Sequence, residues 1–98
     1  MANINVVMDK AELEKPEDER IIDYLIVTFD RAWLQRSFSN GHTEILEGDM
    51  KITFRTDDIV AVCEGQTETR FTLSNGHMIT VHSNEPGAKE VVEFFKNN

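Results

Sequence analysis

The sequence of 98 residues predicts one α+β domain, residues 1–98, in which a small curved antiparallel sheet packs against helices. Three observations lead to this class. The dipeptide Asn-Gly occurs twice between runs that alternate apolar and polar residues. A strand-like run, "DDIVAVCE", lies between the two copies, and the last residues carry an apolar stripe at helical spacing.

Both Asn-Gly dipeptides belong to the tetrapeptide Ser-Asn-Gly-His, at residues 39–42 and 74–77. The runs "LQRSF" and "HTEIL" flank the first copy, and "RFTL" and "MITVH" flank the second. Asn-Gly between such runs is the strongest short-range hairpin signal, because a type I′ turn needs positive φ at both central residues. We therefore predict two hairpins with type I′ turns. In the second hairpin, alternation places on one face Phe71, Leu73, Ile79 and Val81.

The run "DDIVAVCE" has apolar residues on both faces, which predicts a central strand. Ile59, Ala61 and Cys63 fall on one face, and Val60 and Val62 on the other. Cys63 is the single cysteine, so an internal disulfide is impossible, and in a central strand it would act as a small buried hydrophobe.

The first third of the chain is ambiguous. "NINVV", residues 3–7, suits a short strand. Proline at 16 followed by three carboxylates is typical of a helix start, and the apolar residues of "RIIDYLIVTFDRAW" follow helical spacing, which favours an N-terminal helix over 16–32. The same segment is rich in β-branched residues, and "YLIVTF" has high strand propensity, so a strand stays open.

The C-terminal segment "SNEPGAKEVVEFFKNN" predicts a second helix. Ser83 or Asn84 is a candidate N-cap, and Pro86 sits near the first turn. The stripe that would pack on the sheet consists of Ala88, Val91, Val92 and Phe95.

The net charge of −8 restricts the partners that we expect. It argues against direct nucleic-acid binding, where Lys and Arg must neutralise phosphates, and against docking on an anionic membrane. A protein with a basic surface is a more natural partner, although acidity also serves solubility alone. One cysteine, a charged opening segment and no apolar run long enough to span a bilayer predict a cytoplasmic protein.

Motifs for catalysis, cofactors and metals are missing from the sequence. His77 and His82 are separated by an odd offset, which in a strand puts them on opposite faces and prevents shared metal ligation. No glycine-flanked serine elbow, paired-cysteine motif or phosphate-binding glycine loop occurs. We therefore predict a protein that is not an enzyme and holds no cofactor or metal.

Acidic residues concentrate in residues 9–19, with six carboxylates against two lysines. We expect this segment to form a negative surface that imitates nucleic acid and covers a basic site on another protein. The candidate contact residues are Glu12, Glu14, Glu17, Asp18, Glu19 and Asp23. The predicted function is a small inhibitor or regulator of the phage or mobile-element type. A solvated helix start is the plainer interpretation. Exposed strand edges suggest a homodimeric structural or accessory subunit as an alternative.

Residues 36–95, from "RSFSNG" to "VVEFF", resemble the small FlbD-type flagellar and swarming regulators. The shared outline is an Asn-Gly hairpin, a "DDIVAV" strand, a second hairpin and a helix like "AKEVVEFF". The resemblance implies a regulatory protein as an alternative function, and it leaves the first third of the chain unexplained. The stretch from "DDIVAVCEG" onward is also similar to LytTR domains, which implies a basic DNA-reading surface that this acidic chain lacks.

Overall fold

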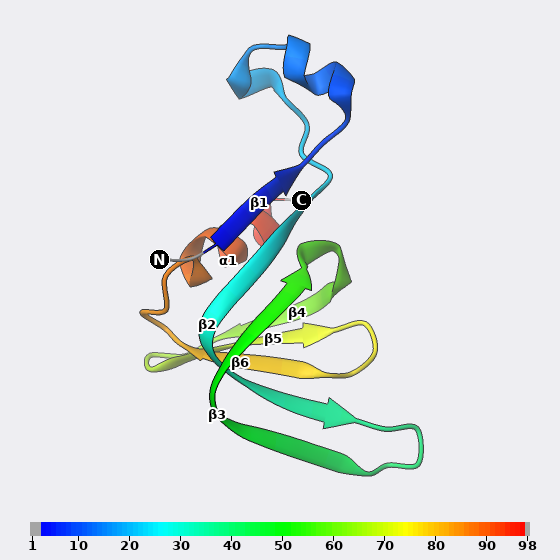
Figure 1. Ribbon diagram of the computed structural model, residues 1–98, viewed down its shortest axis with the longest axis vertical. Coiled ribbons are helices and arrows are strands. Elements are labelled where there is room, and N and C mark those ends of the chain that lie inside the picture. The colour runs from blue at the N-terminus through cyan, green and yellow to red at the C-terminus, as the bar shows by residue number, and fades with distance from the viewer. Residues whose placement is uncertain (1–2, 98) are drawn as a thin grey trace.

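The computed structural model describes residues 3–97, apart from the side chains of residues 47–49. Six strands form one antiparallel sheet (Figure 1): β1 Asn3–Val7, β2 Tyr24–Ser37, β3 Thr43–Arg55, β4 Ile59–Glu64, β5 Glu68–Leu73 and β6 Met78–His82. The helix α1 spans Ala88–Lys96, and three short 3-10 helices span Lys10–Glu14 (η1), Glu17–Glu19 (η2) and Thr56–Asp58 (η3). A small antiparallel sheet with a C-terminal helix suits the predicted α+β class.

The long strand β2 organises the sheet. The strands follow the order β1-β2-β6-β5-β4, and β3 also pairs with β2. Residues 24–28 of β2 pair with β1, whereas residues 32–35 pair with β6. Because β3 pairs with both halves of β2, β1 and β6 share the opposite edge of that strand.

A bulge separates the two halves of β2. The register with β3 shifts between Phe29 and Ala32, both of which are buried, while Asp30 and Arg31 between them are exposed. The backbone N–H groups of Asp30 and Arg31 donate to one carboxylate oxygen of Glu85, over 3.1 and 3.3 Å. Figure 1 shows β2 and β3 changing direction here, so the bulge bends the sheet.

The helix predicted over 16–32 was wrong. Within that range the structure has the 3-10 helix η2 and the first residues of β2. Leu25, Val27 and Phe29 are buried, and the residues between them are half-buried. A strand with apolar side chains on both faces also has apolar residues at helical spacing. The β-branched content and the pairing partners on both edges decide for the strand.

The core lies between one face of the sheet and α1. Phe29, Phe54 and Phe71 form an aromatic cluster with ring centroids 5.5 to 5.9 Å apart. Leu25, Val27, Ile79 and Val81 surround it, and α1 contributes Ala88, Val91 and Val92. The predicted C-terminal helix and its apolar stripe are therefore confirmed. The predicted capping by Ser83 or Asn84 was wrong, because Gly87 precedes α1 with a φ of 91° and no side chain caps the helix.

Both Asn-Gly dipeptides lie in loops between antiparallel strands, but the predicted type I′ turns were wrong. Gly41 and Gly76 have φ values of 85° and 88°, and no residue other than glycine has positive φ in the described chain. In the first loop the Gly41 N–H donates to Phe38 O over 3.0 Å and the Phe38 N–H donates to His42 O over 2.9 Å. This pattern is a three-residue loop that requires positive φ only at its glycine.

The two loops lie side by side and share an aromatic contact. The Phe38 ring stacks on the His42 ring with centroids 5.7 Å apart and meets the His77 ring edge-on at 6.5 Å. Nδ1 of His77 accepts a hydrogen bond of 3.2 Å from the Ser37 N–H. The second histidine therefore joins the loop of β5 and β6 to the hairpin of β2 and β3.

The strand predicted to be central, β4, lies at the end of the sheet. It contains a register shift between Ile59 and Ala61, and Ile59 is buried while Val60 is 58% exposed. Ala61 and Cys63 are exposed as well, which contradicts the predicted buried role of Cys63.

We expect the Thr56 hydroxyl to stabilise the fold measurably. It accepts a buried hydrogen bond of 2.8 Å from the Leu25 N–H, beyond the last paired residue of β3. The substitution Thr56→Val keeps the shape but leaves that N–H without a partner, which costs about 1–3 kcal/mol of unfolding free energy. Urea denaturation followed by circular dichroism measures the loss. Thr56→Ser keeps the hydroxyl, and an equal or larger loss in that variant would contradict this role.

Candidate protein interface

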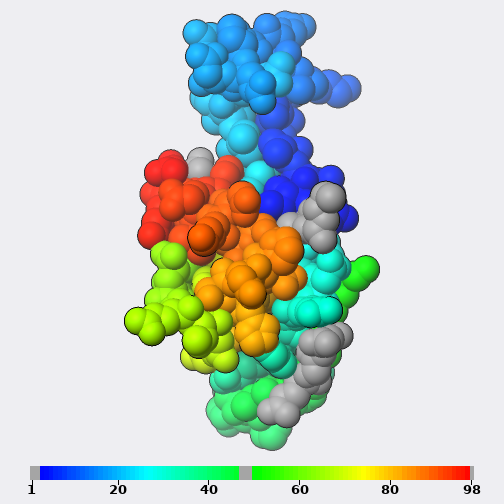
Figure 2. Space-filling view, turned by 90° about the vertical axis from the view of Figure 1, so that its left-hand side faces the viewer, coloured from blue at the N-terminus to red at the C-terminus, as the bar shows by residue number. Residues whose placement is uncertain are grey.

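The acidic segment forms a projecting arm, which we define as residues 8–23. It connects β1 to β2 and contains η1 and η2. Figure 2 shows the arm, in blue, standing off the body of the molecule on a narrow neck. The arm contributes to the elongated shape, which measures 46 × 29 × 20 Å. Neither of its short helices has a buried residue. The conformation of these two helices therefore depends on hydrogen bonds, whereas Ile22 near the base of the arm packs against the core.

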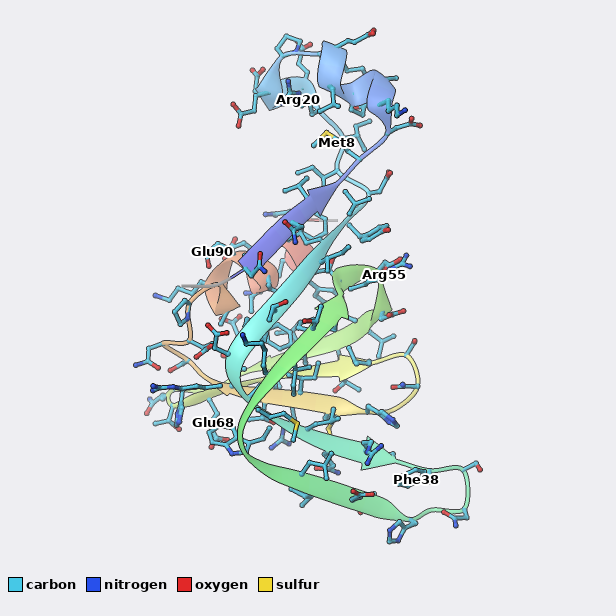
Figure 3. The ribbon with its side chains drawn as sticks, in the orientation of Figure 1. Met8, Arg20, Phe38, Arg55, Glu68 and Glu90 are labelled. Carbon is cyan, nitrogen blue, oxygen red and sulfur yellow. The ribbon has the colours of Figure 1, made fainter. Side chains whose placement is uncertain are left out.

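Arg20 holds the arm together from within (Figure 3). Its Nε donates to Lys15 O and its Nη2 donates to Leu13 O, both over 3.1 Å. At the base of the arm, the Asp23 N–H donates to Val7 O over 2.9 Å and closes the β1–β2 ladder. A guanidinium that bridges two carbonyl oxygens fixes the chain because its donors have a rigid geometry.

Glu12 is the second internal contact of the arm. Its Oε1 accepts a hydrogen bond of 2.7 Å from the Ile21 N–H, and its Oε2 lies 2.9 Å from Nζ of Lys15. The contact with Lys15, followed by the hydrogen bond from Ile21, lowers the pKa of the Glu12 carboxyl below its ordinary value. Since its side chain is only 12% exposed, Glu12 supports the arm and is a poor contact for a partner.

The other predicted contact residues are exposed. Four of them lie in η1 and η2 within the arm: Glu14, Glu17, Asp18 and Glu19. Asp23 lies apart from them at the base of the arm, where it lines a hollow together with Thr56, Asp57, Ile59, Phe94 and Phe95. All six predicted residues therefore lie in the arm, and four of them are exposed carboxylates of η1 and η2.

Apolar residues of the arm were missed by the sequence analysis. Leu13 is 58% exposed and Ile21 is 65% exposed, beside the carboxylates of η1 and η2. A few well-buried side chains carry most of the affinity of a protein interface, whereas charges at its rim mainly steer and orient the partner. The sequence signal for an exposed apolar contact was Leu13, a single leucine within the acidic run. Ile21 gave no such signal, because the predicted helix assigned it to the buried side.

The sheet face opposite the core carries a second group of side chains. One row of paired residues crosses four neighbouring strands: Trp33 of β2, Thr80 of β6, Arg70 of β5 and Cys63 of β4. The Trp33 ring meets the His82 ring edge-on, with centroids 4.9 Å apart. An open hollow of about 480 Å³ on this face is lined by Trp33, Leu34, Gln35, Ile45, Glu68, Arg70 and Thr80. The sequence did not predict this face, because the helical spacing of the apolar residues in "RIIDYLIVTFDRAW" assigned Trp33 to the buried side of a helix.

The described residues 3–97 contain no group of three or more His, Cys, Asp or Glu side chains placed to hold a metal ion. In the same part of the chain, no helix has the length and apolar character needed to cross a membrane. Comparison with family models, curated proteins and solved structures finds no match to this chain. The resemblance of residues 36–95 to FlbD-type regulators therefore stays a prediction.

We expect the order of the arm to depend on pH through Glu12. The pKa of this carboxyl is lowered in the folded chain. Its contribution to the stability of the arm is therefore complete at pH values above its ordinary pKa, and it is lost as the pH falls through the lowered pKa. Amide hydrogen exchange by NMR should show the Ile21 N–H losing protection over this acidic range. In Glu12→Gln the acid-dependent step should vanish. A step of equal size in that variant would assign it to another carboxylate.

Proposed function

We propose that this protein is a non-enzymatic, cytoplasmic binding module that attaches to a basic surface of another protein through its acidic arm. The observation that carries the proposal is the arm itself, a hydrogen-bonded projection with the exposed carboxylates Glu14, Glu17, Asp18 and Glu19. Arg20 and Glu12 fix the shape of the arm, so that its exposed carboxylates keep a defined arrangement that a partner can match.

The partner that best suits this arm is a protein that handles nucleic acid. Such proteins carry clustered Lys and Arg side chains at phosphate spacing, and a carboxylate-bearing projection can occupy that cluster. The net charge of −8 adds a long-range field that speeds encounter with a basic site. The protein would then act as an inhibitor or regulator of the phage or mobile-element type, competing with nucleic acid for its partner.

Specific binding needs more than charge. Exposed ion pairs contribute only about 0.2–1 kcal/mol each and weaken with salt. Leu13 and Ile21 provide apolar area that a complementary cleft can bury. The internal contacts of the arm lower the conformational entropy that binding would otherwise have to overcome.

Neutralising three arm carboxylates should test this function. The variant Glu17→Gln, Asp18→Asn, Glu19→Gln keeps the internal contacts of Arg20 and Glu12 but removes three exposed charges. We expect about a tenfold weaker affinity for the captured partner and a smaller dependence on salt. Affinity purification from the native host identifies the partner, and surface plasmon resonance at several salt concentrations measures its binding.

The matched control removes three charges from elsewhere on the surface, at Asp58, Glu90 and Glu93, all of which are exposed. The control should bind within about twofold of the unaltered protein. If both variants weaken binding equally, the net charge and not the arm attracts the partner. If neither has an effect, the acidic arm is not the binding surface, and competition with nucleic acid for the partner should then be absent as well.

A further inference from the structure

The outer edge of β4 offers unpaired backbone groups. In the described chain β4 pairs only with β5, and the Gly65 N–H donates to Glu68 O over 2.7 Å. Backbone groups alternate between the two edges of a strand, so Cys63, two residues earlier, also bonds toward β5. The N–H and C=O groups of Val62 and Glu64 therefore point outward, where another strand can pair with them.

The edge of β4 carries no proline, and its bulge at Val60 lies outside the stretch from Val62 to Glu64. Charged side chains and proline commonly protect such edges. The outer strand β3 carries Glu44, Lys51 and Arg55, whereas β4 reads "IVAVCE". Its single carboxylate, Glu64, is held by Lys96, with Nζ 2.8 Å from Oε1. Val60, Ala61 and Cys63 are exposed beside it, so the edge is apolar and locally neutral.

A second copy of this chain is the occupant that the edge fits, because the outward groups of Val62 and Glu64 lie symmetrically about Cys63 and can pair with one another. Two copies that each carry −8 repel one another, and they approach most easily where local charge is neutralised. The strand order places β1, which leads into the acidic arm, at the opposite end of the sheet from β4. Ile59, at the start of β4, lines a hollow with Asp23 at the base of the arm, but antiparallel pairing places the Ile59 ends of the two copies at opposite ends of the paired strands, which keeps the two arms apart. Pairing through β1 would bring them together.

We propose that two copies pair antiparallel through β4 and form one continuous sheet. A two-fold axis at Cys63 places Val62 of each copy opposite Glu64 of the other, which uses all the outward groups of these residues in four hydrogen bonds. An axis at Val62 would instead require the bulged Val60 to pair regularly. The first register is therefore the better one.

The favoured register makes a specific geometric prediction. The two Cys63 residues become a directly opposed, non-hydrogen-bonded pair, in which Cα atoms lie about 4.5 Å apart. This separation falls within the range that a disulfide can span. Cys63 thus becomes a reporter of the interface. The inference does not rest on the acidic arm, because it concerns the isolated protein without any partner.

Sedimentation velocity over a range of concentrations tests the dimer. We expect a reversible monomer–dimer equilibrium that Val60→Lys weakens at least tenfold, since a lysine on an exposed edge opposes pairing. Val6→Lys is the matched control on β1, where Val6 is 48% exposed, and it should leave the equilibrium unchanged. A monomer at millimolar concentration, or a dimer that only Val6→Lys weakens, would overturn the proposal.

Cross-linking provides a second measurement that does not depend on a destabilised variant. Diamide accepts the two electrons and two protons that a pair of Cys63 thiols releases as their S–S bond forms, and it becomes the hydrazine. We expect a covalent dimer from the unaltered protein. The control Cys63→Ser, Ala61→Cys carries its thiol on the same exposed face but away from the axis, and it should cross-link much more slowly. Equal cross-linking of the two would exclude this register.

Discussion

The fold depends on the bulge in β2 and on the carboxylate that holds it. Glu85, from the segment before α1, accepts hydrogen bonds from the backbone N–H groups of Asp30 and Arg31. Without the extra residue, β2 would continue in one direction and present a single register to its neighbours. With it, one edge of β2 pairs first with β1 and then with β6. Glu85 thus connects the bend of the sheet to the start of the helix that covers the core.

The same arrangement explains why the acidic arm projects. The β1–β2 ladder ends at Val7 and Tyr24, whereas the pairing of β2 with β3 begins only at Ile26 and Arg55. The helices η1 and η2 have no buried residue, so Arg20 and Glu12 supply the hydrogen bonds that order this part of the chain. A segment ordered mainly by polar contacts opens locally at a smaller free-energy cost than the core strands do. Its order also depends on the charge state of its side chains.

The elements that could be predicted from the sequence are those whose patterns have one interpretation. The stripe of α1 has one polar face and one apolar face, and the structure agrees with it. β2 could not be assigned in the same way, because its two halves bury side chains of opposite parity, Phe29 before the bulge and Ala32 after it. The apolar run of β4 suggested a central strand, yet Val60 and Cys63 are exposed at an edge. The charge of the arm was evident in the sequence, but the internal role of Glu12 depends on Ile21, nine residues away.

The repeated tetrapeptide combines a local requirement with a tertiary one. In both copies the asparagine side chain accepts a hydrogen bond of 2.9 Å from the histidine N–H, and the glycine supplies the positive φ. These features depend on the loop alone and explain why Asn-Gly recurs. The histidines differ, since His42 stacks on Phe38 within its own hairpin whereas His77 accepts a hydrogen bond from Ser37 of the other hairpin. The same residue type therefore serves one local contact and one contact between hairpins, and no spacing within the sequence distinguishes the two.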